Sequence, residues 1–220
     1  MSESRQQKIN HPVKRLIFLC IGLSVMAFGV AFSIKAALGT SPISSVPYVT
    51  AAISGLSVGF TTIIVNTVFI LLQIVILCKQ YDWFQLLQFP AILLFGAMID
   101  VAGKVIEGIS FSNYFQQWIL CAIGIFLVGL GVSMEITAKL ITTAGEGIVL
   151  AICQVTSIRF SNMKIIFDVS QVVIAITLSL IFIGHLDGVR EGTVAAAIFV
   201  GLITKQTNKL MKKVGTKFLA

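Results

Sequence analysis

The sequence predicts an all-α polytopic membrane protein made of two tandem repeats. Three observations lead to this prediction: 57% of the residues are hydrophobic and only 11% are charged, several apolar runs have membrane-spanning length, and the chain contains an internal repeat. So few charges cannot cover a soluble surface, and the apolar runs exceed what one buried core needs. We therefore expect the chain to lie in a membrane.

The repeat aligns residues 21–74 with the stretch 102 positions later, without a gap. Eight of the first twenty aligned positions are identical. The matching residues are Ile21, Gly22, Gly29, Val30, Ile34, Ala36, Leu38 and Thr40, which recur as Ile123, Gly124, Gly131, Val132, Ile136, Ala138, Leu140 and Thr142. Many secondary transporters are built from such a duplicated module, with the substrate site where the halves meet.

Apolar runs mark the elements of each repeat. A helix needs about 20 apolar residues to span a bilayer, and six segments are candidates: 16–38, 60–78, 86–106, 116–138, 163–183 and 190–207. The resulting organisation is a basic tail at 1–15, a first membrane repeat at 16–108, a second at 114–208 and a basic tail at 209–220.

Two shorter segments, 42–54 and 145–157, lie between the first and second spans of each repeat. A helix of about 13 residues is about 20 Å long, which is less than the ~30 Å hydrocarbon core. We expect broken or re-entrant helices here, which gives six crossings and inverted repeats. The alternative is that both segments cross, giving eight helices in a parallel arrangement of four plus four.

The net charge of +7 is concentrated at the two ends of the chain, and seven bases face eight acids between the tails. Basic ends beside apolar spans place both termini in the cytoplasm. A nucleic-acid partner is not expected, because no basic and aromatic surface lies between the tails.

Each short segment begins with hydroxyl residues. Free N–H groups at a helix start attract anions, and irregular backbone at membrane depth usually lines a cavity. We expect the two starts to face one cavity that takes a small polar or anionic solute. The predicted solute ligands are Thr40, Ser41, Ser44, Ser45, Asn66, Thr142 and Thr143. The alternative is that the hydroxyls only cap their own helices.

Two carboxylates distinguish the second repeat from the first. Glu146 and Asp168 occupy the positions of Ser44 and Asn66. Acids in apolar segments are expensive and often functional, so we expect this pair to carry a proton or hold a cation during transport. The alternative is a structural ion pair with Lys164 or Arg159.

Two further acids have a lysine four residues on. Asp100 precedes Lys104 and Glu135 precedes Lys139, spacings that place both charges on one helix face. We expect ion pairs at the membrane interface. The sequence has no nucleophile elbow, metalloprotease or phosphate-loop motif, so neither an enzyme activity nor a metal or other cofactor is predicted.

Several short motifs resemble the YczE and YyaS group of bacterial inner-membrane proteins, which is similar in layout to the YitT proteins. The residues that carry the resemblance are Ala36, Leu38, Gly39, Pro42, Gly59, Gly96 and Asp100, with Glu191, Gly192 and Thr193 opening the last helix. The resemblance implies a bacterial plasma-membrane location. The group commonly has an aromatic residue and an acid after its proline, whereas this chain has Ile43, Ser44 and Ser45.

The leading functional hypothesis is a small secondary carrier. A second is a substrate-capture subunit of a multi-component uptake system. Such subunits have a face of alanines on their first helix, which Ala27 and Ala31 resemble here. A third is a structural or regulatory membrane protein without a substrate. Candidate partners are therefore the lipid bilayer, a small solute, and either a second copy of the chain or an uptake-system subunit.

Overall fold

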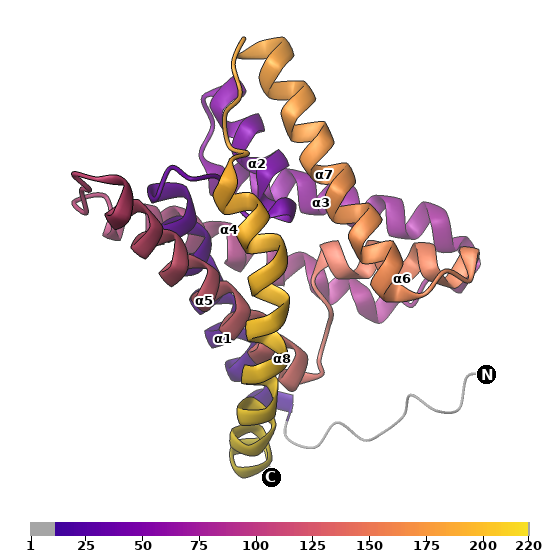
Figure 1. Cartoon of the computed structure of the whole chain (residues 1–220). Helices are drawn as coiled ribbons and strands as arrows, with labels where there is room; N and C mark the ends of the chain where they lie inside the picture. Colours follow the sequence, from indigo (N-terminus) through magenta and orange to yellow (C-terminus); the bar gives the residue numbers. More distant parts are fainter. Residues whose placement is uncertain (1–11, 220) are drawn as a thin grey trace.

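The computed structural model describes residues 12–219, and within that range the fold is entirely helical (Figure 1). Its elements are α1 (Pro12–Lys35), α2 (Pro42–Ser54), α3 (Val58–Leu77), η1 (Cys78–Gln80), η2 (Trp83–Leu87), α4 (Gln88–Val105), α5 (Tyr114–Ala138), α6 (Ala144–Thr156), α7 (Phe160–Phe182) and α8 (Glu191–Leu219). The predicted all-α class is confirmed.

Five helical segments in the described range are long and apolar enough to cross a membrane: Pro12–Lys35, Val58–Gln80, Trp83–Val105, Tyr114–Ala138 and Phe160–Phe182. They match the first five predicted spans. The sixth predicted span, 190–207, forms the first part of α8, which is not among these five segments. The predicted C-terminal tail at 209–220 continues α8 as far as Leu219, whereas most of the tail at 1–15 lies outside the described residues.

The two short helices occupy the predicted positions. α2 and α6 have 13 residues each, and each follows a non-helical segment after a long span. α2 begins with Pro42, where the missing N–H of proline has no helical partner to lose. Both helices end at a residue with left-handed backbone conformation, Gly55 and Ser157.

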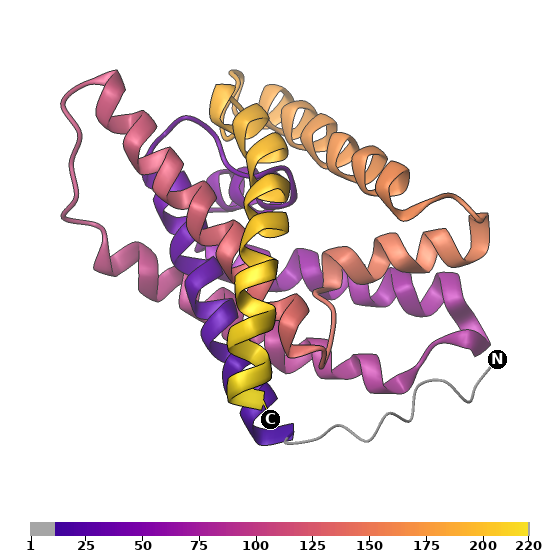
Figure 2. The same cartoon turned by 60° about the horizontal axis from the view of Figure 1, so that its bottom comes forward.

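Helices α1 and α5 cross at glycines that let their backbones meet. A Cβ atom added at Gly29 would lie 2.8 Å from the Gly124 carbonyl oxygen, and one at Gly131 would lie 2.7 Å from the Gly22 carbonyl oxygen. Residue numbers rise along one helix as they fall along the other, so the two helices are antiparallel. α8 packs beside this pair (Figure 2).

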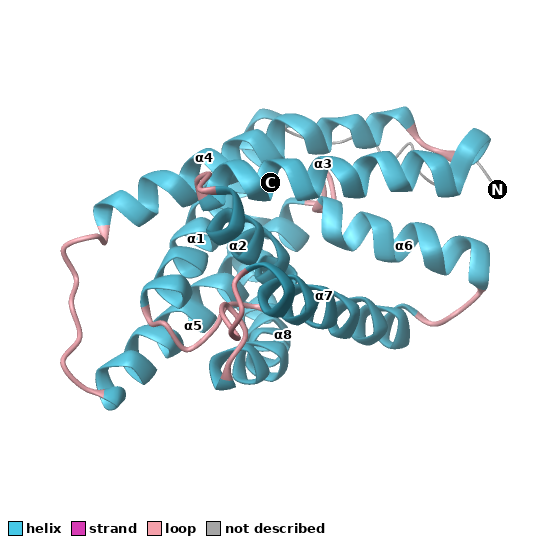
Figure 3. Ribbon diagram, turned by 90° about the horizontal axis from the view of Figure 1, so that it is seen from above, coloured by secondary structure: helices cyan, strands magenta, loops and turns pink. Residues whose placement is uncertain are grey.

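Helices α2, α3, α6 and α7 form a second group, and α4 packs against both this group and α1. α3 packs against α4 and α6, and α2 packs against α3 and α7. Seen from above, α3, α6 and α7 extend to the same side of the molecule (Figure 3). The shift of 102 residues relates α2 to α6 and α3 to α7, so the α2–α7 and α3–α6 contacts are equivalent under the predicted repeat. Two inverted copies of one module would make these contacts. The duplication itself stays a prediction.

Asp100 does not make the expected interface pair with Lys104. Its carboxylate accepts hydrogen bonds from the Gly59 N–H at 2.8 Å and the Ser57 hydroxyl at 2.7 Å. The close contact between Gly59 on α3 and Gly96 on α4 brings the carboxylate to the first turn of α3. Asp100 therefore caps a neighbouring helix, where its negative charge meets the free N–H groups.

Candidate functional site

A cavity of about 370 Å³ lies where the two halves of the chain meet. Most of its wall is apolar and comes from α1, α4, α5 and α8. The polar part of the wall consists of Ser41, Ser44, Thr62, Asn66, Gln88, Glu135, Thr142, Thr143, Glu146, Lys164, Asp168 and Thr204. An apolar cavity with a few convergent polar groups is the usual form of a small-molecule site.

Seven of the nine predicted site residues line this cavity: Ser41, Ser44, Asn66, Thr142, Thr143, Glu146 and Asp168. They come from both halves of the chain, as the repeat would require. The structure therefore brings the starts of α2 and α6 to one cavity. The solute-binding role of these residues stays a prediction.

The other two predicted ligands, Thr40 and Ser45, do not line the cavity. The Thr40 backbone N–H donates to the Gly188 carbonyl at 3.0 Å, and the Ser45 hydroxyl donates to the Pro42 carbonyl at 2.6 Å. Both side chains are buried among protein atoms. For these two residues the structure favours the alternative of a local structural role.

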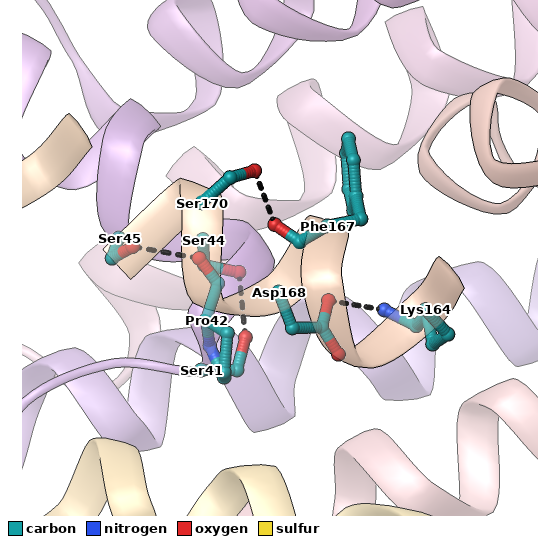
Figure 4. Close-up of polar contacts among 8 residues, drawn as sticks. All are labelled: Ser41, Pro42, Ser44, Ser45, Lys164, Phe167, Asp168 and Ser170. Carbon is teal, nitrogen blue, oxygen red and sulfur yellow. Dashed lines mark hydrogen bonds and ion pairs between the residues drawn. The ribbon is translucent and has the colours of Figure 1, made fainter. Parts of the chain in front are cut away.

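At the start of α2, the Ser41 hydroxyl donates to the Ser44 hydroxyl at 3.0 Å. Ser41 is the residue before the first helical turn, but its side chain makes no hydrogen bond to the backbone of that turn. Figure 4 shows this serine pair beside Asp168 of α7. Each hydroxyl keeps an acceptor lone pair, so the pair suits a solute that donates hydrogen bonds.

The start of α6 already holds a protein carboxylate. Glu135, which is only 3% exposed, accepts a hydrogen bond from the Thr143 N–H at 2.7 Å. The expected pairing of Glu135 with Lys139 is wrong because α5 ends at Ala138 and Lys139 has a left-handed φ of 51°. Lys139 therefore does not lie one helical turn beyond Glu135. Glu135 already occupies the Thr143 N–H, so this donor at the helix start is not free to bind an anion.

Asp168 and Lys164 form an ion pair one helical turn apart on α7, with 2.5 Å between the carboxylate and the ammonium group (Figure 4). Their side chains are 25% and 29% exposed, so both still reach the cavity. This is the structural pair that the sequence left as an alternative. Glu146 has no hydrogen bond or ion pair within the described part of the chain, although it interacts electrostatically with Lys164 and Asp168.

Sequence reasoning missed Gln88, a buried glutamine that contacts Gln73 beside α6. Gln73 of α3 is fully buried, and its amide nitrogen donates to the Ala144 carbonyl at 3.1 Å and to the side-chain oxygen of Gln88 at 3.4 Å. The amide nitrogen of Gln88 has no partner among the residues described. The sequence feature that could have indicated Gln88 is its position, as a polar residue, near the start of the apolar run at 86–106.

No group of His, Cys, Asp and Glu suited to a metal ion occurs in the described part of the chain. Its cysteines are free and lie on different helices.

Comparison with known proteins gives relatives but no characterised activity. The chain is 23% identical to the uncharacterised protein YyaS of Bacillus subtilis over 87% of this chain and 94% of YyaS. It is 26% identical to the uncharacterised membrane protein YczE of the same organism over 88% of this chain and 85% of YczE. No solved structure matches the chain.

The resemblance to YczE and YyaS that the sequence motifs indicated is thus confirmed. A membrane-protein relative and five apolar helices of spanning length identify a multi-pass membrane protein. The model of a family of unknown function, DUF6198, matches residues 13–209, so the chain belongs to this family.

Proposed function

We propose that this protein is a secondary transporter, rather than an enzyme, and that it moves a small polar solute through the cavity between its two halves. The observation that carries the proposal is the meeting of the α2 and α6 starts at one cavity of about 370 Å³. Broken helices that point their starts at a site near the bilayer midplane are a common design of secondary transporters. We place the protein in a bacterial plasma membrane with both termini in the cytoplasm.

The packing of the helices supports alternating access. The antiparallel α1 and α5 would form the contact between two inverted repeats, and α2 and α6 would reach the site from opposite halves. Rocking one half against the other would then expose the cavity first on one side of the membrane and next on the other. Small residues at the α1–α5 crossing keep the two backbones in direct contact.

The polar groups of the cavity disfavour an anionic solute, which the sequence had left open. Three carboxyl groups and one ammonium group line the cavity, and Glu135 occupies the start of α6. Carboxyl oxygens are hydrogen-bond acceptors and the Thr143 N–H is already taken, so an anion would find few free donors there. The proposal is therefore a polar solute that is neutral or positively charged.

The test is uptake by the purified chain alone in liposomes. The liposomes are incubated with the small-molecule fraction of a bacterial extract, and the solutes inside are identified by mass spectrometry. We expect at least one solute to accumulate over empty liposomes. Thr142→Trp, which fills the cavity, should abolish this uptake, and Thr156→Trp at the exposed end of α6 should not.

No uptake by the chain alone, with uptake restored by an ATPase partner, would instead identify a capture subunit. Equal uptake by Thr142→Trp and the wild-type protein would contradict the cavity as the route.

A further inference from the structure

The carboxyl groups of the cavity are unequally satisfied. Glu135 accepts the Thr143 N–H and Asp168 pairs with Lys164. Glu146 has neither a hydrogen bond nor an ion pair to the rest of the described chain, and the single cavity lysine is already engaged by Asp168. The site thus contains one carboxyl group, that of Glu146, which no described residue contacts through a hydrogen bond or an ion pair.

A second observation points to a ligand at the same place. Gln88 lines the cavity, is only 1% exposed, and its amide nitrogen lacks a hydrogen-bond partner among the residues that the structure describes. A buried donor left unpaired is costly, by about 1–3 kcal/mol. A ligand with an oxygen acceptor would remove this cost.

Gln88 and Glu146 belong to the same end of α6. Gln73 contacts both the Gln88 side chain and the Ala144 carbonyl in the first turn of α6. A Cβ atom added at Gly147 would lie 2.6 Å from the side-chain oxygen of Gln73. Gln88 and Glu146 both line the same cavity, so one solute could meet the unpaired donor and the Glu146 carboxyl group.

We propose that the transported solute is a small organic amine that carries an ammonium group and an oxygen acceptor. This inference rests on the proposed transport function and specifies its substrate class. Glu146 binds the ammonium group, Gln88 donates a hydrogen bond to the acceptor, and the apolar wall contacts the carbon skeleton. Lys164 keeps Asp168 paired, so Glu146 is the carboxylate that the solute meets.

A bare metal ion does not fit this wall. The described residues contain no cluster of ligands for one, and a cavity of about 370 Å³ is far larger than an ion. The apolar majority of the lining also favours an organic skeleton.

The experiment measures thermal unfolding of the full purified chain in detergent with pairs of probes. Each pair is an ω-amino amide, from two to six carbons in length, and the amide of the same length without the amine. A ligand that binds the folded state raises Tm. We expect the amino amides to raise Tm. The plain amides, and butanoate as an anionic probe, should leave it unchanged.

Two variants assign the contacts. Glu146→Gln should weaken amino-amide binding at least tenfold, which corresponds to about 1.4 kcal/mol, and Glu107→Gln outside the cavity should bind as the wild type does. Gln88→Leu should bind amino amides and simple alkylammonium ions equally, because it cannot donate to the amide oxygen. The Tm of Gln88→Leu without a probe shows whether this variant folds. If either variant fails to fold, the comparison of probes on the wild-type protein still tests the proposal.

The inference is overturned if no amino amide raises Tm, if butanoate is the probe that does, or if Glu146→Gln binds with wild-type affinity. Uptake of a neutral solute that Thr142→Trp abolishes would then leave the transport function standing with a different substrate class. Absence of all uptake would instead contradict the transport function itself.

Discussion

Charged side chains in this protein are satisfied by other elements more often than by neighbours on their own helix. Asp100 and Glu135 were both expected to pair with a lysine four residues later. Each carboxylate instead caps the start of another helix, α3 or α6. Spacing along a helix could not predict this, because a cap depends on which backbone end the fold brings to the carboxylate. Lys164 and Asp168 do pair at that spacing, since α7 continues through both residues.

Removing the Asp100 cap should destabilise the protein. Asp100→Ala leaves the Gly59 N–H and the Ser57 hydroxyl without their acceptor. Hydrogen bonds to charged groups are worth about 1.5–3 kcal/mol each, so we expect the free energy of unfolding to fall by about 2 kcal/mol. The measurement is equilibrium unfolding in mixed micelles. Glu107→Ala, whose side chain is exposed, serves as the control and should stay close to wild type.

At the scale of elements, the spans and the two short helices could be predicted because length and composition determine them. The predicted short segment 42–54 coincides with α2, and 145–157 lies one residue later than α6. The sequence could not decide between inverted and parallel repeats, because both keep the termini on the same side. The antiparallel crossing of α1 and α5 is the arrangement that inverted repeats would require, and it depends on glycines whose pairing only the fold reveals.

The crossing of α1 and α5 should be sensitive to a single methyl group. An alanine Cβ at position 29 would lie 2.6 Å from the Val128 backbone nitrogen, which is rigid and cannot move aside. We expect Gly29→Ala to lower the free energy of unfolding by about 1–3 kcal/mol, the usual range for overpacking. Gly103→Ala on α4 has open space around its Cβ, so it should be neutral or stabilising by up to about 1 kcal/mol. Equal effects of the two substitutions would contradict the close crossing.

The ends of α1 identify opposite sides of the membrane. The Lys35 ammonium group donates to the Glu107 carbonyl at 2.8 Å, and the Arg15 guanidinium group donates to the Ala138 carbonyl at 3.0 Å. In a cysteine-free background, we expect Glu107→Cys to react with a membrane-impermeant thiol reagent in intact cells. Lys139→Cys, next to Ala138, should react only after the membrane is opened. The reverse pattern would place the termini outside the cytoplasm.

At the scale of the whole molecule, the two halves enclose one cavity with most of the predicted site residues on its wall. Hydroxyl-rich helix starts and unmatched acids were enough to find Ser44, Glu146 and Asp168 from the sequence. Gln88 and Glu135 could not be found in this way, because their roles arise from contacts between elements that only the fold brings together. Gln88 contacts Gln73 of α3, and Glu135 contacts Thr143 at the start of α6. The polarity of the site could be predicted, whereas its excess of carboxylates follows only from this convergence.

The central claim is that this cavity opens to both sides of the membrane in turn. The most direct test is the reaction of a single cysteine, Thr142→Cys in a cysteine-free background, with an impermeant thiol reagent added separately to each side of sealed membranes. The account predicts reaction from both sides, slowed in each case by a transported solute. Reaction from the outer side alone would indicate a capture subunit, and reaction from neither side would indicate a cavity without access, so either result would contradict the account.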